Sequence, residues 1–280
     1  MSVVRLLVAM GLVAALGAPA RADVVLVGSD REHKETIDAA RQTAPGFSFA
    51  DVDSPDAAEQ LRHADVILAV GARALVLART VAADKPIVYA MVAAADAQPG
   101  KGVTGVALEV PAYAELAQWK QLRFDGQRVA FVYDKGAPAL AADAGKAASA
   151  LGLTLVPRAV DAAHAAAAVD ELAPKVDALW IACAWPATAG KWSAKVALLG
   201  SDEKSTAAGA LFSLAPDARD IGRRAARLAL GIAGRTPETR LPVPPPATSP
   251  GALSLNAATA QALGIELPEP IVKKARKVYH

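Results

Sequence analysis

The sequence is poor in cysteine, aromatic residues and long apolar segments, and each shortage excludes a class of protein. Cys183 is the only cysteine among 280 residues, so no disulfide can form within the chain, which excludes a small disulfide-built extracellular module. Aromatic residues make up 5% of the chain, so we expect the helices to pack through small side chains, chiefly alanine. Beyond the first 22 residues no apolar run is long enough to span a bilayer, and we expect the rest of the chain to be soluble.

The first 22 residues have the pattern of an export signal. Arg5 provides the positive start, Leu6–Gly17 is an uncharged apolar run too short to cross a membrane, and Ala20-Arg21-Ala22 supplies the small residues of a cleavage site. The alternative is an uncleaved N-terminal membrane anchor. No cysteine stands at the cleavage site, which argues against a lipoprotein. The pattern predicts cleavage after Ala22 and a periplasmic location.

The predicted mature chain has no net formal charge. Arg5 and Arg21 are two of the 30 Lys and Arg residues, so the 28 that remain balance the 28 Asp and Glu residues. A neutral chain gives no electrostatic reason to expect a nucleic acid or an acidic membrane surface as partner.

Apolar segments of strand length alternate with Ala-rich helical segments throughout the rest of the chain. Several of these strands are apolar without alternation, which is typical of parallel sheets buried on both faces. The repetition predicts an α/β protein with two doubly wound, Rossmann-like lobes, parallel sheets and a ligand cleft between the lobes. The predicted strands are Val24–Gly28, Phe47–Val52, Val66–Gly71, Ile87–Met91, Gly105–Leu108, Arg128–Tyr133, Thr154–Val160, Ala178–Ala182, Val196–Gly200 and Ala210–Leu214.

The predicted domains follow from where the pattern restarts. The first lobe covers residues 23–110 and the second covers residues 111–214, beginning with a helix over Pro111–Phe124 that crosses between them. Part of the C-terminal region, about residues 215–280, is expected to return to the first lobe. Val24–Gly28 is expected to be the central strand of that lobe.

The C-terminal region carries several local signals. Gly234 is placed to end a long helix, and Leu241–Pro246 reads as a linker or an edge strand. Asn256 is a predicted helix cap. The final segment, Glu269–Tyr279, is a further amphipathic piece.

Candidate ligand-binding residues come directly after the predicted strands, because ligands of open α/β sheets bind outside the carboxyl ends of the strands. They are Ser29, Asp30, Arg31, Gly71, Ala72, Arg73, Met91, Tyr133, Asp134, Cys183, Trp185 and Asp202.

Four of these positions have a chemical interpretation. Arg73, two residues after a glycine turn, suits a carboxylate, although it equally suits the first turn of a surface helix. Trp185 is placed to stack on an apolar or aromatic portion of a ligand, or to pack at a rim. Asp134 suits an amine or hydroxyl group, or caps a helix. Cys183 is expected to be a small buried residue.

Catalytic and metal-binding motifs do not occur in the sequence. The four histidines make no HxxxH or HxH spacing, and there is no GxSxG, Walker loop or strand-following GxGxxG. We therefore expect neither an enzyme, nor a metal site, nor a cofactor.

Two regions resemble a known family. Lys85–Val92 followed by Val103–Val106 resembles the "kPIVfa … vTGv" passage of the ABC transporter substrate-binding protein family that is often described as uncharacterised. Gly222–Gly234 and Leu241-Pro242-Val243, followed by Leu255–Pro268, are similar to its closing signature. The resemblance implies a type I periplasmic binding protein fold, capture of a small molecule between two lobes, and delivery to a permease. Characterised relatives bind aromatic amino acids.

The sequence departs from that family where the ligand would bind. Arg73 stands two residues after Gly71, where the family has a glycine followed by a small hydroxyl residue. Ala93-Ala94-Ala95-Asp96 replaces the usual Asp-Pro, and Cys183-Ala184-Trp185-Pro186 replaces a polar turn. The fold therefore carries over from the family, and the ligand does not.

We interpret the chain as a periplasmic solute-binding protein of an ABC-type importer. It would act as a monomer and close by a hinge on a small molecule that is carboxylate-bearing, amino-acid-like or aromatic. Its second partner would be a permease of the inner membrane. The alternative is a periplasmic sensory or assembly protein that has the same fold and serves a different partner.

Overall fold

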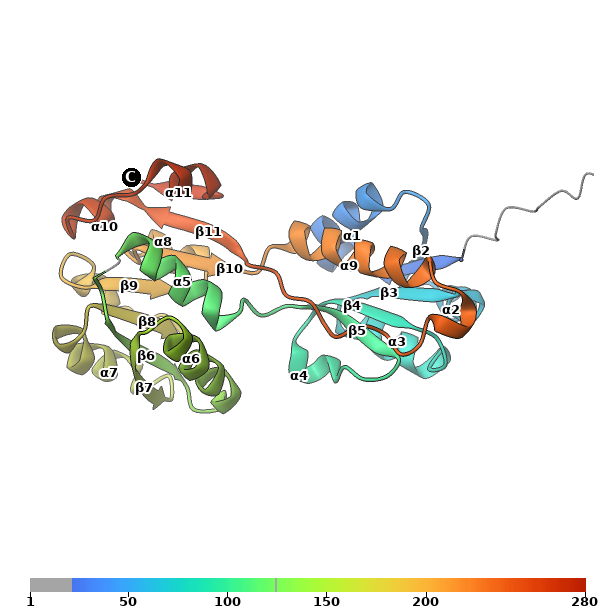
Figure 1. Ribbon diagram of the computed structural model, residues 1–280, viewed down its shortest axis with the longest axis horizontal. Helices are drawn as coiled ribbons and strands as arrows, with labels where there is room; N and C mark the ends of the chain where they lie inside the picture. The colour runs from blue at the N-terminus through green and yellow to red at the C-terminus, as the bar shows by residue number, and fades with distance from the viewer. Residues whose placement is uncertain (1–21, 124) are drawn as a thin grey trace, which may run out of the picture.

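The computed structural model describes residues 22–123 and 125–280 as two α/β lobes that lie side by side (Figure 1). The predicted export signal lies outside the described residues, apart from Ala22. No helix among the described residues is long and apolar enough to cross a membrane.

The first lobe contains a five-stranded sheet in the order β2-β1-β3-β4-β5, with every neighbouring pair parallel. Strands β1 and β3 are buried along their whole length because both sheet faces are covered by helices. The strands are β1 Val24–Gly28, β2 Ser48–Asp51, β3 Val66–Val70, β4 Ile87–Val92 and β5 Val103–Ala107. The helices between them are α1 Asp30–Thr43, α2 Ala57–His63, α3 Ala72–Val81 and α4 Ala94–Ala97.

The prediction that Val24–Gly28 is the central strand is wrong. Strand β3 occupies the centre, and β1 lies between β2 and β3. Strand β2 lies on one side of β1, and β4 and β5 lie beyond β3 on the other side. The lateral position of β1 therefore depends on the side to which each strand–helix–strand connection returns.

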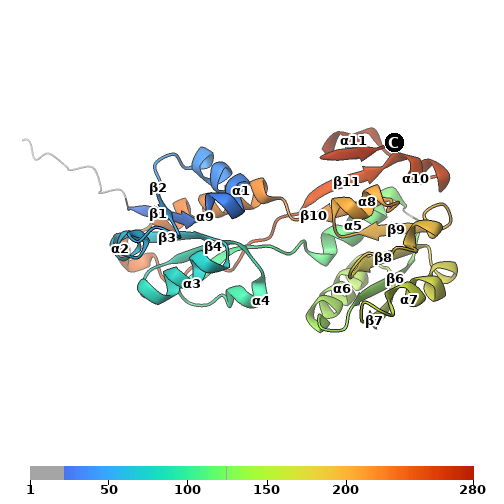
Figure 2. The ribbon, with the colours of Figure 1, turned by 180° about the vertical axis from the view of Figure 1, so that it is seen from behind.

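Helix α9 (Ala218–Ala233) belongs to the first lobe although it follows the strands of the second. It packs with α1 over one face of the first sheet, while α2 and α3 cover the other (Figures 1 and 2). Its buried positions recur at helical spacing, which gives one apolar face. Gly222 allows close contact, because a Cβ atom there would lie 2.3 Å from the Thr36 backbone oxygen on α1.

The second lobe contains a seven-stranded sheet in the order β12-β11-β10-β9-β8-β6-β7. The sheet is parallel except that β11 runs antiparallel to β10. Its strands are β6 Arg128–Asp134, β7 Thr154–Val160, β8 Ala178–Ala182, β9 Ala197–Gly200, β10 Phe212–Ala215, β11 Ala252–Asn256 and β12 Lys277–Tyr279. Its helices are α5 Ala112–Leu122, α6 Pro138–Ala150, α7 Ala165–Leu172, α8 Glu203–Ala207, α10 Ala257–Ala262 and α11 Glu269–Lys274.

The C-terminal region divides between the lobes: α9 packs on the first sheet, whereas β11 and β12 extend the second. The Asn256 cap is confirmed, since its Oδ1 accepts a hydrogen bond from the Thr259 backbone N–H at 2.9 Å. Gly234 follows α9 as predicted but with φ −71°, so it does not need the left-handed conformation. The last predicted segment is only partly helical, because β12 pairs with β11.

The proline-rich segment Leu241–Pro246 forms no strand of its own. It runs beside the outer strand β5, where the Ala247 backbone N–H donates to Gly105 O at 2.8 Å and Ala247 O accepts from the Ala107 N–H at 3.1 Å. Proline lacks the N–H that a longer ladder would need, so this edge is paired over a short distance only.

Candidate ligand-binding site

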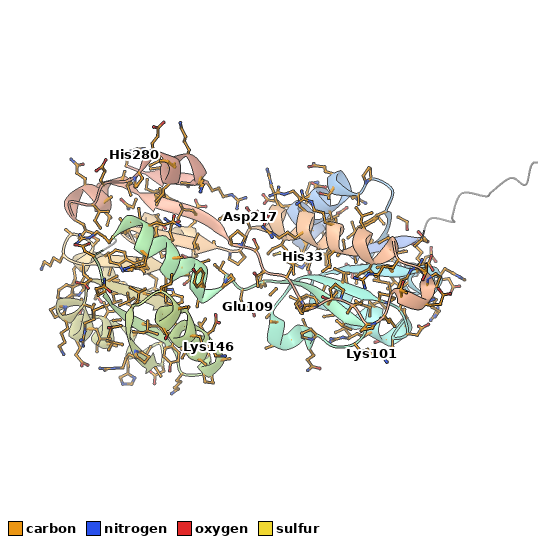
Figure 3. The ribbon with its side chains drawn as sticks, viewed as in Figure 1. His33, Lys101, Glu109, Lys146, Asp217 and His280 are labelled. Carbon is orange, nitrogen blue, oxygen red and sulfur yellow. The ribbon has the colours of Figure 1, made fainter. Side chains whose placement is uncertain are left out.

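Three chain segments, called here the three crossovers, join the lobes at residues 108–111, 216–217 and 248–251. The first leaves the carboxyl end of β5, the second leaves the carboxyl end of β10, and the third enters β11 beside that same end of β10. The carboxyl edge of each sheet therefore lies toward the other lobe (Figures 1 and 2). Figure 3 shows Glu109 and Asp217 on these crossovers, with His33 on the side of the first lobe that faces the second.

The ends of β1 and β3 approach each other closely. Gly71 follows β3 with φ +91°, a conformation that favours glycine, and a Cβ atom there would lie 2.4 Å from the His33 Nε2 atom. His33 has a non-helical backbone in the first turn of α1, next to the buried Ser29, whose carbonyl accepts from the His33 N–H. Two predicted segments, Ser29-Asp30-Arg31 and Gly71-Ala72-Arg73, are thus brought together.

Arg73 is engaged by carboxylates. Its guanidinium donates a hydrogen bond to the Asp53 carboxylate and lies 3.6 Å from the Glu32 carboxylate. The hydrogen bond from Arg73 to Asp53 raises the pKa of the guanidinium, and its side chain is half exposed. The three groups form a mixed-charge cluster at the carboxyl edge of the first sheet, which offers a cation and two anions to a ligand.

At the end of β4, the backbone of Met91 has φ 57° and the register against β5 shifts. Its side chain is partly buried against the core beneath α9. The Glu109 carboxylate, from the first crossover, accepts the Ala94 N–H at 3.0 and 3.1 Å. This contact fixes the start of α4 next to the crossover.

In the second lobe, two carboxylates at the carboxyl edge bind neighbouring backbone groups. The Asp134 carboxylate accepts the Gly136 N–H at 2.7 Å, and Asp202 caps α8 by accepting the Ser205 N–H at 2.7 Å. Both carboxylates therefore stabilise local turns, but Asp134 does not cap the following helix α6, whose N-cap residue is Ala137. Tyr133 stacks on Phe131 with ring centroids 5.0 Å apart.

Cys183 and Trp185 follow β8. Burial raises the pKa of the Cys183 thiol, and the nearby charge of Asp134 adds to the effect. The Trp185 ring is partly buried against the core beneath α7. Among the described residues, no hydrogen bond or ion pair joins a predicted site residue of one lobe to one of the other lobe.

Sequence reasoning missed Glu32, Asp53 and Glu109. The signal for Asp53 was present, because Val52-Asp53 follows β2 as the other candidates follow their strands. Glu109 had the same signal, since it directly follows the predicted strand Gly105–Leu108, whereas Glu32 lies within α1 and its role depends on Arg73. Over residues 22–123 and 125–280, no three His, Cys, Asp or Glu side chains are grouped to hold a metal ion.

Comparison with protein families gives one match: the model of a family described as ABC transporter substrate binding protein matches residues 47–279. No curated protein matches the sequence.

Solved structures give further matches. A ligand-free, open substrate-binding protein with adhesive properties from Clostridium difficile is 17% identical with a TM-score of 0.68, over 92% of this chain and 99% of that one. An ABC domain in complex with L-Trp from Streptococcus pneumoniae is 20% identical with a TM-score of 0.55, over 92% and 100%. A periplasmic ribose ABC transporter structure from Conexibacter woesei is 14% identical with a TM-score of 0.53, over 87% and 93%. At these identities the likeness establishes the fold, that of the type I periplasmic binding proteins.

Proposed function

The chain belongs to the ABC transporter substrate-binding protein family, and we propose that it is the periplasmic solute-binding component of an ABC-type importer. The observation that carries this proposal is the placement of the carboxyl edges of both sheets toward each other, joined by only three crossovers. Such an arrangement allows the lobes to rotate about the crossovers and enclose a small molecule. A permease would then recognise the closed form, which presents both lobes in one fixed orientation.

The mixed-charge cluster favours an amino-acid-like ligand. Arg73 is already neutralised by Asp53 and Glu32, so a ligand with a carboxylate alone would have to displace an existing ion pair. A zwitterion leaves the net charge of the cluster unchanged: its carboxylate binds Arg73 and its ammonium binds the acidic side chains. Trp185 would contact the apolar part of the ligand from the second lobe.

Export fits the same proposal. Cleavage after Ala22 would release a chain whose first strand begins at Val24, so the lobe starts directly behind the cleavage site. We propose that the mature protein works as a monomer in the periplasm.

The test is ligand binding by the purified mature protein. Native mass spectrometry would detect a ligand carried through purification, and a thermal shift panel of amino acids, small acids and sugars would follow. We expect an amino acid to raise the Tm, and Arg73→Ala to weaken its affinity about tenfold or more. Arg62→Ala is the matched control, because Arg62 pairs with Glu59 on α2 away from the carboxyl edge.

Two results would contradict the proposal. A Tm that no compound of the panel moves at saturation would argue against a solute-binding role. An Arg73→Ala variant that binds as tightly as Arg62→Ala would remove Arg73 from the site.

Co-purification with a permease would distinguish an importer component from a sensory or assembly protein of the same fold.

A further inference from the structure

A cavity of about 550 Å³ lies in the second lobe, between α5, the start of β11 and the turn from α11 to β12. Its apolar lining includes Leu214, Leu253 and Ile271. None of the predicted site residues lines it. The volume falls in the range of small-molecule sites.

Two of the three charged side chains of the lining are cations. The Lys274 ammonium makes no hydrogen bond or ion pair with any residue in the described part of the chain, and Arg276 stands two positions further on. The Gln118 amide nitrogen is buried without an acceptor. The one carboxylate of the lining, Asp217, accepts the Asp220 N–H at 3.0 Å and caps α9. Apolar side chains beside the unpaired Lys274 and a second cation, Arg276, fit a small organic anion with an apolar body.

The cavity is lined by residues of the second and third crossovers and by α5, which follows the first. Tyr113 follows the first, Asp217 belongs to the second and Gly251 belongs to the third. Gly251 has φ +82°, and a Cβ atom there would lie 2.9 Å from a methyl group of Val110 and 3.0 Å from the Ala215 carbonyl oxygen. The crossovers thus pack against one another beside the cavity, so a rotation of the lobes would change its walls.

Arg276 also links the cavity to the first lobe. Its guanidinium lies 3.5 Å from the carboxylate of Glu35 on α1, which lies 3.7 Å from Arg219 on α9. This is an ion pair between the lobes, because Arg276 is fixed to the second sheet by its backbone N–H, which donates to Leu253 O at 2.7 Å. An anion in the cavity would compete with Glu35 for Arg276.

We propose that this cavity is a second small-molecule site, which binds an apolar organic carboxylate and shifts the arrangement of the lobes through Arg276. It goes beyond the proposed solute-binding role and does not depend on the ligand between the lobes. A bound anion shifts the lobes because it binds more tightly where Arg276 is released from Glu35.

The binding test uses benzoate as probe and benzamide as its neutral counterpart, followed by amide NMR shifts of the mature protein. We expect saturable benzoate shifts around Ala114, Gly251 and Ile271, and weaker binding of benzamide. Lys274→Gln should weaken benzoate about threefold or more and leave benzamide unchanged. Lys273→Gln is the matched control, since Lys273 pairs with Glu269 on the same helix outside the cavity.

Benzoate shifts confined to the carboxyl edges around Arg73 and Trp185 would overturn the site. So would an absence of saturable shifts at millimolar benzoate, or equal effects of Lys274→Gln and Lys273→Gln.

The coupling test measures the distance between spin labels on the two lobes. The exposed Lys101 and Lys146 lie on different lobes (Figure 3) and would be replaced by cysteine in a Cys183→Ser background. We expect benzoate to shift the distance distribution, and Glu35→Gln to show the shifted distribution without benzoate. A distribution that saturating benzoate leaves unchanged would overturn the coupling.

Discussion

The backbone N–H of Asp23 donates a hydrogen bond to the Asp65 carboxylate at 2.9 Å, and the Asp65 backbone N–H donates to the Asp23 carbonyl at the same distance. The second carboxylate oxygen of Asp65 accepts from the nearly buried Arg240 at 2.8 Å. Asp65 therefore holds together the residue that follows the predicted cleavage site and a residue far along the chain. The Asp23 hydrogen bond, and then Arg240, lower the pKa of Asp65.

Cleavage after Ala22 should strengthen this contact. It would turn the Asp23 N–H into an ammonium beside a carboxylate, which adds about 0.5 kcal/mol or more to the stability. We expect the mature chain to be more stable in urea than a chain that begins with methionine followed by Ala22. The difference should be present below about pH 8, where the terminal ammonium of Asp23 stays protonated.

The Asp65→Asn substitution should abolish that difference, whereas Asp38→Asn, which removes a surface pair with Lys34, should keep it. The lowered pKa of Asp65 means that its own contribution is present above the unfolded value and is lost as the pH falls through the folded value. Equal stabilities of the two chains at pH 6 would contradict the prediction.

Glu115 should make the protein less stable as the pH rises. Its side chain is 3% exposed, one carboxylate oxygen lacks a partner, and burial raises its pKa well above the ordinary value, against a hydrogen bond from the Leu214 backbone. Between the unfolded pKa near 4.3 and the raised folded value, the folded state holds a proton that the unfolded state has lost. Stability therefore falls across that interval.

We expect Glu115→Gln to match the parent near pH 4 and to exceed it at pH 8 in urea unfolding. The exposed Glu269→Gln on α11 serves as control and should show no such divergence. Parallel pH profiles for the parent and Glu115→Gln would show that the carboxyl is ionised in the folded state.

Two glycines of α9 should respond in opposite directions to alanine. A Cβ atom at Gly222 would lie 2.3 Å from the Thr36 backbone oxygen, so α1 and α9 would have to separate, at a cost of about 2 kcal/mol. Gly231 has no neighbouring atom within 4 Å of the same position, and alanine there should stabilise the helix by about 0.5–1 kcal/mol. Chemical unfolding measures both, and a neutral Gly222→Ala would contradict the close packing of the two helices.

Trp185 should report ligand binding by fluorescence. Trp119 and Trp180 are buried, and the Trp192 indole N–H donates to Asp170 at 2.8 Å, so these rings are held within the second lobe. Only Trp185 of the four follows a strand at the carboxyl edge. The fluorescence change on binding an amino acid should disappear in Trp185→Phe and persist in Trp192→Phe; the reverse result would place the ligand elsewhere.

The sequence predicted the elements whose causes are local. Val66–Val70 is recognisable as a buried strand because all its residues are apolar, and the Asn256 cap depends on an N–H only three residues away. The succession of strands and helices likewise predicted two α/β lobes. The candidate site was predicted as far as strand ends, because the carboxyl edge of a parallel sheet follows from the strand pattern alone.

Only the tertiary structure decided the lateral position of β1 and the pairing of Arg73. Strand order depends on the side to which each strand–helix–strand connection returns. Arg73 meets Asp53 because β2 and β3 flank β1. Asp65 and Arg240 are 175 residues apart, and the cavity beside the crossovers is lined from α5, β11 and α11 together. Short-range hydrogen bonds and burial are encoded by neighbouring residues, whereas these contacts form only once distant segments pack against one another.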